Sequence, residues 1–440
     1  MKSQATFKTA IFINSPDFFF LNKVSQSGLY ILVEKNSLLE NFARKNFAKE
    51  KIITYLYKQQ PEIKDPVSLA IDDLLVETNL SPQLIKNKIE YLFIPYRSSK
   101  KIEAWSAKSG IKLIVTPWQL QDKFENKKYF AEFLRDFKIA SPRRIFSLAE
   151  IKNKKSYVMQ EARVSNYFRT KFFSQGYNLV GYLKAKNVEL KKFVIREYLP
   201  GMAVGVSVFV DRQGNYFFSA LRQQCFVYKN DFPKQFIGVQ WLAANNFSQN
   251  LLKKIGNQLT KVSQALIVRG FYGLANIDLI IYNNRPFILE CNPRLSISMP
   301  QVFSRSNLSA HKDSWQFFLS SFIENKKIKI KKNNIPAGNF IGSVLDIENS
   351  KKIIIKRPLP QGVYRVIGKR IIFVSSKLSD FKRRKNYFFL FHELEKNQIL
   401  DKGYSLCTIF SNFCLFDRKR GVLNNSGKLL NNYFNQELGK

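Results

Sequence analysis

The residues best suited to chemistry lie in one segment, 270–294, which contains two acids, an amide and an arginine at regular spacing. Asp278 lies inside one apolar run, and Glu290 lies near the end of the next run, twelve residues later. Asn292 and Arg294 follow Glu290 at intervals of two residues. Because residues two apart point to the same face of a β-strand, we expect these last three side chains on one face.

Two strand-like runs, Ala275–Ile281 and Pro286–Cys291, are separated by Tyr282–Arg285, which has the composition of a tight turn. A hairpin closed at this turn places Asp278 opposite the Glu290 region. Two carboxylates and one amide oxygen then converge on one face, and such donors suit a hard cation such as Mg²⁺. A hairpin with its acids on the surface is the alternative. The apolar runs around both acids favour burial, where carboxylates need partners.

This segment resembles the closing motif of the ATP-grasp superfamily, most closely the branch with biotin carboxylase, carbamoyl-phosphate synthase and carboxylate–amine ligases. The resemblance rests on Gly270–Asp278 and Ile288–Arg294. In that family the residues matching Asp278, Glu290 and Asn292 hold Mg²⁺ on ATP, and the residue matching Arg294 contacts phosphate or the reacting group. The resemblance therefore implies ATP and Mg²⁺ (or Mn²⁺) as cofactors.

Residues upstream extend the resemblance over about half of the chain. Lys127, at the start of a helix predicted over 126–137 with Asn126 as its cap, matches a lysine that reaches an ATP phosphate. A helix start also favours anions, although an ordinary solvated lysine is the alternative. Gln160 ends a strand-like run where the family usually has a second ATP-binding lysine, and some branches have Gln there.

The segment 196–199 resembles the hinge strand that hydrogen-bonds adenine in the family. Arg196 stands where an acidic residue is common. The resemblance implies that Glu197, Tyr198 and Leu199 lie at the base, which backbone groups would recognise whatever the side chains. Polar residues are common at strand ends, so a purely structural role is the alternative.

Arg222 and Gln223 fall where the family often contacts the acyl or phosphate intermediate. The resemblance thus makes Arg222 and Arg294 the candidate catalytic residues. Both are guanidinium groups, which can hold an anionic group through two parallel hydrogen bonds.

Two departures from the family pattern limit what the resemblance implies. The stretch from Glu161 to Thr170 contains no glycine, whereas the family usually has a glycine-rich loop that closes over the phosphates. A catalytically degenerate nucleotide-binding protein is therefore an alternative to an enzyme. Ser298 stands where members similar to biotin carboxylase have an acid for bicarbonate activation, which counts against carboxylation.

The function predicted from these residues is an ATP- and Mg²⁺-dependent ligase. A small carboxylate would attack ATP to give an acyl phosphate, and an amine or related nucleophile would displace phosphate to form a carbon–nitrogen bond. The resemblance is the source of the acyl-phosphate step. The sequence identifies neither substrate, and it leaves a homodimer open.

The elements that must position these residues suggest α/β and α+β architecture in three parts. The first part, residues 1–120, alternates strand-like and helix-like runs and is predicted as a parallel α/β pre-grasp domain. Residues 121–330 are predicted as a two-lobed ATP-grasp domain, and residues 335–440 as a small β-rich domain. Strands are expected at 7–13, 30–33, 91–94 and 111–115, helices at 38–47, 100–108, 250–268 and 315–323, and residues 50–90 are expected to be rich in helix.

Composition and charge fit a folded protein of 440 residues, of which 45% are hydrophobic and 24% charged. Lysine and arginine outnumber acids by 71 to 33, a net charge of +38, so a nucleic-acid partner is an alternative. The basic residues are scattered, with only short runs at 326–332 and 382–385, and we do not favour that alternative.

Cysteine usage and hydropathy indicate a cytoplasmic protein without a membrane segment. The chain has four cysteines without CxxC spacing and two histidines, which makes a zinc site of these residues unexpected. Free thiols fit a reducing compartment. The apolar stretch 10–21 is interrupted by polar residues and proline, so it is neither a signal-peptide core nor a membrane span.

Overall fold

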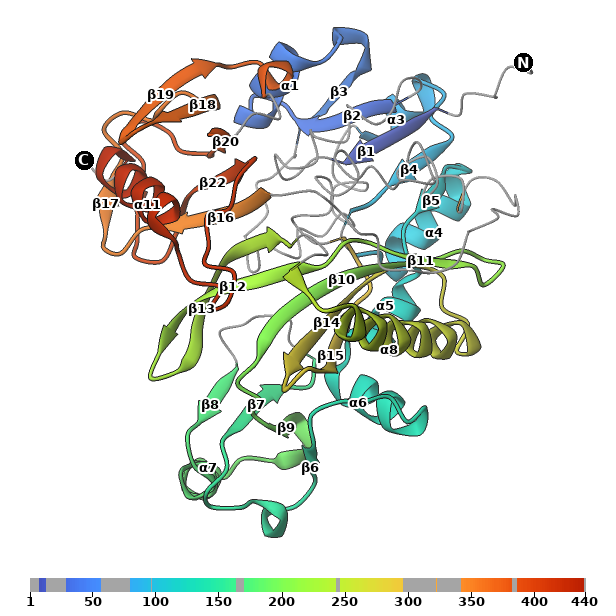
Figure 1. The fold of residues 1–440 in the computed structure, drawn as a ribbon. Coiled ribbons are helices and arrows are strands. Elements are labelled where there is room, and N and C mark those ends of the chain that lie inside the picture. Colours follow the sequence, from blue (N-terminus) through green and yellow to red (C-terminus); the bar gives the residue numbers. More distant parts are fainter. Residues whose placement is uncertain are drawn as a thin grey trace.

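The computed structural model describes residues 8–12, 29–56, 80–95, 97–163, 170–242, 246–295, 322, 342–381 and 386–438. These residues form a parallel sheet near the N-terminus, a small four-stranded sheet and a long antiparallel sheet (Figure 1). The predicted combination of a parallel α/β unit with antiparallel ATP-grasp sheets is thereby confirmed. No helix in these ranges is long and apolar enough to cross a membrane.

The N-terminal sheet has five parallel strands in the order β3-β2-β1-β4-β5. The strands are β1 (Thr9–Phe12), β2 (Leu29–Glu34), β3 (Ile52–Tyr55), β4 (Tyr91–Phe93) and β5 (Lys112–Ile114). The helices of this part are α1 (Leu38–Asn46), α3 (Leu80–Lys86) and α4 (Lys100–Ser109).

The prediction that residues 50–90 are rich in helix is confirmed at α3 but was wrong at residues 52–55, which form strand β3. The β-branched run of Ile52, Ile53 and Thr54 favours a strand, and it pairs in parallel with β2. Residues 57–79 of the same stretch lie outside the described residues.

A small antiparallel sheet follows two helices that run one after the other. The helices are α5 (Trp118–Glu125) and α6 (Lys127–Asp136). The sheet has the order β6-β9-β7-β8, with β6 (Arg144–Ile145), β7 (Tyr157–Glu161), β8 (Lys171–Phe173) and β9 (Phe193–Glu197). Helix α7 (Gly176–Ala185) packs Leu179 and Leu183 against this sheet. Helices α5 and α7 were not predicted from the sequence. In α7, two glycines and several β-favouring residues obscure the helical pattern.

The long sheet has eleven antiparallel strands and runs across the middle of the molecule (Figure 1). Its first part contains β10 (Met202–Val210), β11 (Tyr216–Phe218), β12 (Arg222–Lys229), β13 (Phe232–Trp241), β14 (Gly273–Tyr282) and β15 (Arg285–Asn292). Helix α8 (Gln249–Val268) covers one face of this part and buries Ile255, Leu259 and Val262 there. The helix predicted at 250–268 is thus confirmed.

Most of the C-terminal strands continue the same sheet, through pairing with β13. These strands are β16 (Gly342–Glu348), β18 (Gly362–Ile367), β19 (Arg370–Ser375), β20 (Tyr387–Phe391) and β22 (Ser405–Ser411). Two short strands, β17 (Ile353–Ile354) and β21 (Ile399–Leu400), pair with each other in a separate sheet, and helix α11 (Asn425–Leu438) follows. The β-rich character predicted for residues 335–440 is seen, while the domain limits at 120 and 330 stay predictions. The helix predicted at 315–323 lies outside the described residues except for Phe322.

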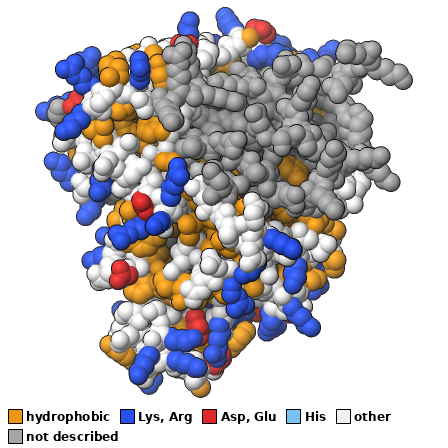
Figure 2. All heavy atoms as spheres, in the orientation of Figure 1, with side chains coloured by type: hydrophobic (Ala, Val, Ile, Leu, Met, Phe, Trp, Pro, Cys, Tyr) orange, Lys and Arg blue, Asp and Glu red, His pale blue; other side chains and the backbone are white. Residues whose placement is uncertain are grey.

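Short 3₁₀ turns occur at Lys49–Lys51, Leu148–Glu150, Leu190–Lys192 and Leu378–Asp380. On the face shown in Figure 2, Lys and Arg side chains are scattered over the described surface and do not gather on one element. This distribution agrees with the scatter of basic residues along the chain.

Helix α6 offers a test of how its first turn is stabilised. The Asn126 side-chain oxygen accepts hydrogen bonds from the backbone N–H groups of Lys128 (3.0 Å) and Tyr129 (3.1 Å). Asn126→Ala leaves both groups without this acceptor, so we expect the free energy of unfolding to fall by about 1 kcal/mol. Urea denaturation followed by circular dichroism measures the change. Asn126→Asp keeps the acceptor and serves as the control; equal midpoints for the alanine variant and the wild type would contradict the assigned cap.

Candidate active site

The hairpin predicted from the sequence is present and has the expected closure. Strands β14 and β15 pair antiparallel, with Asp278 opposite Glu290 and Asn276 opposite Asn292. The turn residues Asn283 and Asn284 have φ angles of 48° and 54°, a conformation that asparagine tolerates well. A bulge next to Asp278 interrupts the regular register. Such bulges redirect the neighbouring side chains, here beside the two acids.

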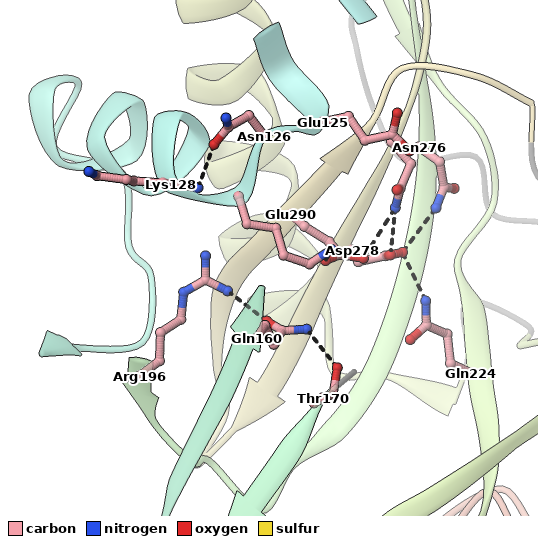
Figure 3. Close-up of polar contacts among 12 residues, drawn as sticks. Glu125, Asn126, Lys128, Gln160, Thr170, Arg196, Gln224, Asn276, Asp278 and Glu290 are labelled. Atoms are coloured by element: carbon pink, nitrogen blue, oxygen red, sulfur yellow. Dashed lines mark hydrogen bonds and ion pairs between the residues drawn. The ribbon is translucent and has the colours of Figure 1, made fainter. Parts of the chain in front are cut away.

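Asp278 is a buried carboxylate, 8% exposed, held by three side-chain amides. One carboxylate oxygen accepts from Gln224 Nε2 and from Asn276 Nδ2, each at 2.9 Å, and the other accepts from Asn292 Nδ2 at 3.1 Å (Figure 3). Asn292 also donates to Glu290 Oε1 at 3.3 Å. The three side chains predicted to lie on one face, Asp278, Glu290 and Asn292, are therefore in contact.

The start of helix α6 brings a cation to the second acid. Lys127 Nζ lies 3.1 Å from Glu290 Oε2, and the lysine is only 6% exposed. The Lys127 N–H donates to the Ala162 carbonyl (2.8 Å) just after strand β7, which fixes the helix start against the small sheet. Lys127 therefore lies beside the second acid, while its contact with an ATP phosphate stays a prediction.

The pKa values of the two acids are shifted in opposite directions. Burial, followed by the negative charge of Glu290, raises the pKa of Asp278 to about 8, and Arg222 opposes this rise. Burial also acts to raise the pKa of Glu290, but the ammonium of Lys127 outweighs it and holds this pKa at about 2. At neutral pH a proton on Asp278 relieves the repulsion between the two carboxylates. A divalent cation could replace that proton and stabilise both carboxylates in their ionised form.

The donor set fits Mg²⁺ better than it fits a softer metal. Two carboxylates and one side-chain amide converge here. Oxygen donors that leave positions for phosphate and water are typical of Mg²⁺ sites.

A cleft of about 310 Å³ extends from these acids along the small sheet. The predicted site residues in its lining are Lys127, Gln160, Glu197, Tyr198, Leu199, Asp278 and Glu290. Its other end is aromatic and is lined by Phe172, Tyr198, Phe226, Tyr228 and Phe236. The cleft therefore has a charged end and an apolar end, as a binding site for a nucleotide requires.

Two backbone N–H groups of the predicted hinge, residues 196–199, already donate hydrogen bonds within the protein. The N–H of Glu197 donates to the Arg143 carbonyl and the N–H of Tyr198 donates to the Ser156 carbonyl, both at 2.9 Å. A base in this cleft would therefore have to be recognised by other backbone groups of the hinge than these two donors.

Both candidate catalytic arginines lie outside the lining of the cleft. Arg294 donates through Nε to Glu125 Oε1 at 3.2 Å, and Glu125 also pairs with Arg97. Arg222, 2% exposed, donates to Ser207 Oγ at 2.8 Å and to the Asn276 side-chain oxygen. Arg222 thus orients the amide that binds Asp278, and the contact of either arginine with a substrate stays a prediction.

Several residues at the site are not assigned by the sequence analysis. Asn276 precedes Asp278 by two residues, so strand alternation could have found it. Gln224 comes from strand β12 and reaches Asp278 across β10, a neighbour relation that no local pattern reveals. Glu125 is buried at the end of α5, and its pairing with Arg294 joins segments far apart in the chain. Residues 164–169 of the glycine-free loop and Ser298 lie outside the described residues.

Solved structures with this architecture include biotin carboxylases and a ligase. The biotin carboxylase domain of Hydrogenobacter thermophilus 2-oxoglutarate carboxylase has a TM-score of 0.63 at 13% identity, covering 93% of this chain and 86% of that chain. Biotin carboxylase from Campylobacter jejuni has a TM-score of 0.61 at 12% identity, covering 92% and 88%. Phosphoribosylamine–glycine ligase from Thermotoga maritima has a TM-score of 0.56 at 11% identity, covering 91% and 92%.

At these identities the likeness shows the fold alone. No curated protein matches the sequence. The family described as the ATP-grasp domain matches residues 124–298, a range that contains the hinge, the cleft and the β14–β15 hairpin. Residues 124–298 of this chain therefore form an ATP-grasp domain.

Proposed function

We propose that this protein is an ATP- and Mg²⁺-dependent ligase that activates a small carboxylate as an acyl phosphate for attack by an amine. One observation carries the proposal: Asp278 and Glu290 face each other at the charged end of a cleft in an ATP-grasp domain, with Lys127 beside them. The H. thermophilus biotin carboxylase domain was solved in complex with MgADP, which agrees with a nucleotide in a cleft of this fold.

Asp278, Glu290 and Asn292 would hold the cation, with Mn²⁺ as a substitute for Mg²⁺. When bound there, the cation would supply positive charge that offsets the charge of the phosphates during phosphoryl transfer. Asp278 has to give up its proton to bind it. Glu290 is already ionised and has to share its charge between the cation and Lys127.

The remaining residues would bind and orient the nucleotide. Lys127, whose ammonium pairs with Glu290, would turn that ammonium to a phosphate oxygen. Gln160 and the hinge residues Glu197, Tyr198 and Leu199 line the side and the apolar end of the cleft. The aromatic side chains at that end would exclude water from a base and stack against it.

Arg294 and Arg222 are proposed to act near the reacting groups in different ways. Arg294 would contact a substrate anion only by loosening its bond to Glu125. Arg222 would act through Asn276, which it holds against Asp278. The carboxylate and amine substrates are proposed from the resemblance to carboxylate–amine ligases. A homodimer stays a prediction; the H. thermophilus biotin carboxylase domain was solved as a dimer.

Metal binding should depend on pH in a direction set by Asp278. Its pKa of about 8 means that a proton competes with the cation below that pH, whereas Glu290 is ionised throughout the neutral range. We therefore expect Mn²⁺ affinity to rise from pH 6 to about pH 8, by up to about tenfold per unit, and then to level off. Electron paramagnetic resonance of free Mn²⁺ measures the affinity. Asp278→Asn should bind weakly with a flat profile; a wild-type affinity independent of pH would contradict the raised pKa.

Turnover should require both acids. Asp278→Asn and Glu290→Gln are each expected to lower ADP release by roughly 100-fold or more, because the cation and its position are lost. ADP release is measured against pooled amino acids and small carboxylates. Hydroxylamine then traps any acyl phosphate as a hydroxamate.

A matched control for these variants is Asp346→Asn. Asp346 lies on β16 of the same sheet, accepts a hydrogen bond from Thr408 Oγ1 (2.8 Å), and is not part of the cleft lining. It should leave turnover unchanged. Wild-type turnover in Asp278→Asn would remove the site assignment, and ATP binding without ADP release under any substrate mixture would identify a nucleotide-binding protein that is not a ligase.

A further inference from the structure

Arg196 is a buried cation in the wall of the cleft that the mechanism above does not use. It lies on strand β9, next to Val158 of β7, and is only 3% exposed. Its side chain lines the cleft together with those of Gln160 and Glu290. Figure 3 shows the guanidinium extending toward Gln160, on the side of the cleft where Glu290 lies.

The guanidinium is poorly satisfied by the described residues. Its Nη1 donates to Gln160 Oε1 at 3.5 Å, which is a long hydrogen bond. Its Nη2 is buried and has no hydrogen-bond acceptor among the residues that the structure describes. Burying a charged donor without a partner costs free energy, so this arrangement favours a ligand that brings an acceptor.

Neighbouring charges also favour an anion beside Arg196. The negative charge of Glu290 acts on Arg196 and raises its pKa, but the Glu290 carboxylate is already paired with Lys127. Arg144 lies opposite Arg196 on β6 and adds positive charge, although it is itself paired with Glu132 at 3.2 Å. Burial first, and then Arg144, lower the pKa of Arg196, and Glu290 opposes them; the pKa of about 10 keeps the group charged at neutral pH.

Gln160 orients this cation and supplies no charge of its own. Its Nε2 donates to Thr170 Oγ1 at 3.3 Å, which turns its oxygen toward Arg196. On this wall the positive charge therefore comes from β9 and not from β7. Among the described residues that line the cleft, Lys127 and Arg196 are the two cations, and both act on Glu290.

We propose that Arg196 binds a phosphate oxygen of the nucleotide, with Gln160 as the residue that positions its guanidinium. The inference rests on the proposed function, since it presumes a polyphosphate in this cleft. A polyphosphate held at Asp278 and Glu290 passes between the two cations. A guanidinium can then give it two parallel hydrogen bonds, including one from the Nη2 that lacks an acceptor among the described residues.

The test compares ligands with and without phosphates in the full-length protein. Arg196→Met removes the charge and the unpartnered donor but keeps an apolar side chain of similar length. Isothermal titration calorimetry with Mg²⁺ present measures binding of ATP, inorganic tripolyphosphate and adenosine. We expect ATP and tripolyphosphate to bind roughly 10- to 100-fold more weakly to the variant. Adenosine affinity should not change.

Two further variants separate phosphate binding from a structural role. Arg144→Met removes the neighbouring guanidinium, which does not line the cleft, and should leave ATP affinity within about twofold. The double variant Gln160→Lys/Arg196→Met moves the positive charge from β9 to β7 and should recover part of the lost affinity for tripolyphosphate. Arg196→Lys, which keeps the charge without the fork, should lie between the wild type and Arg196→Met, and it provides the comparison if the methionine variant does not fold.

The outcomes distinguish this inference from the proposed function. If Arg196→Met binds ATP and tripolyphosphate as tightly as the wild type does, the role of Arg196 is overturned and the ligase proposal still stands. Equal weakening of adenosine and ATP overturns it too, because the residue would then support the base or the fold. A wild-type protein that binds neither ATP nor tripolyphosphate overturns both.

Discussion

The antiparallel pairing of β14 with β15 sets the buried Asp278 directly across from the partly buried Glu290. Two carboxylates at this separation repel each other, and burial strengthens the repulsion. The rest of the site can be understood as a response to that repulsion. Three amides donate to Asp278, and one ammonium pairs with Glu290. Burial, and after it the charge of Glu290, raises the pKa of Asp278, whereas Lys127 lowers the pKa of Glu290.

The fold supplies the partners of these acids from elements far apart in the sequence. Lys127 comes from the start of α6, Gln224 from β12 and Arg196 from the small sheet. The tip of the β12–β13 hairpin also touches the small sheet: Phe232 stacks on Phe172 at 5.6 Å between ring centroids and lies 5.0 Å from Tyr198. These aromatic contacts hold the apolar end of the cleft, while the acids and cations hold the charged end. The cleft is therefore a junction of two sheets, and its shape depends on both.

Positive charge in the cleft is distributed differently from what the family resemblance implied. At Gln160, where a second lysine is common, the side chain is neutral, and on the paired strand Arg196 stands where an acid is common. Among the described lining residues of this wall, the positive charge thus lies on Arg196 and not on residue 160. The overall positive charge of the chain does not form a local patch on the face shown in Figure 2, because Lys and Arg are spread over the described surface.

Local signals in the sequence determined the hairpin, the capped helix and the long helix α8. Each of these depends on residues close together in the chain: the Asn283–Asn284 turn with its flanking alternation, the Asn126 cap, and the apolar period of α8. The metal-binding prediction was specific for the same reason, since Asp278, Glu290 and Asn292 lie within one hairpin. Helix α7, which lacks a clear apolar period, was missed.

Only the tertiary structure decided which distant residues meet these acids. The pairing of β10 with both β12 and β14 brings Gln224 to Asp278, and the pairing of β9 with β7 brings Arg196 to Gln160. It also placed Arg222 and Arg294 outside the cleft lining, against Asn276 and Glu125. Strand order and register between distant segments depend on how the whole core packs, and a single sequence without homologues carries no local signal for them.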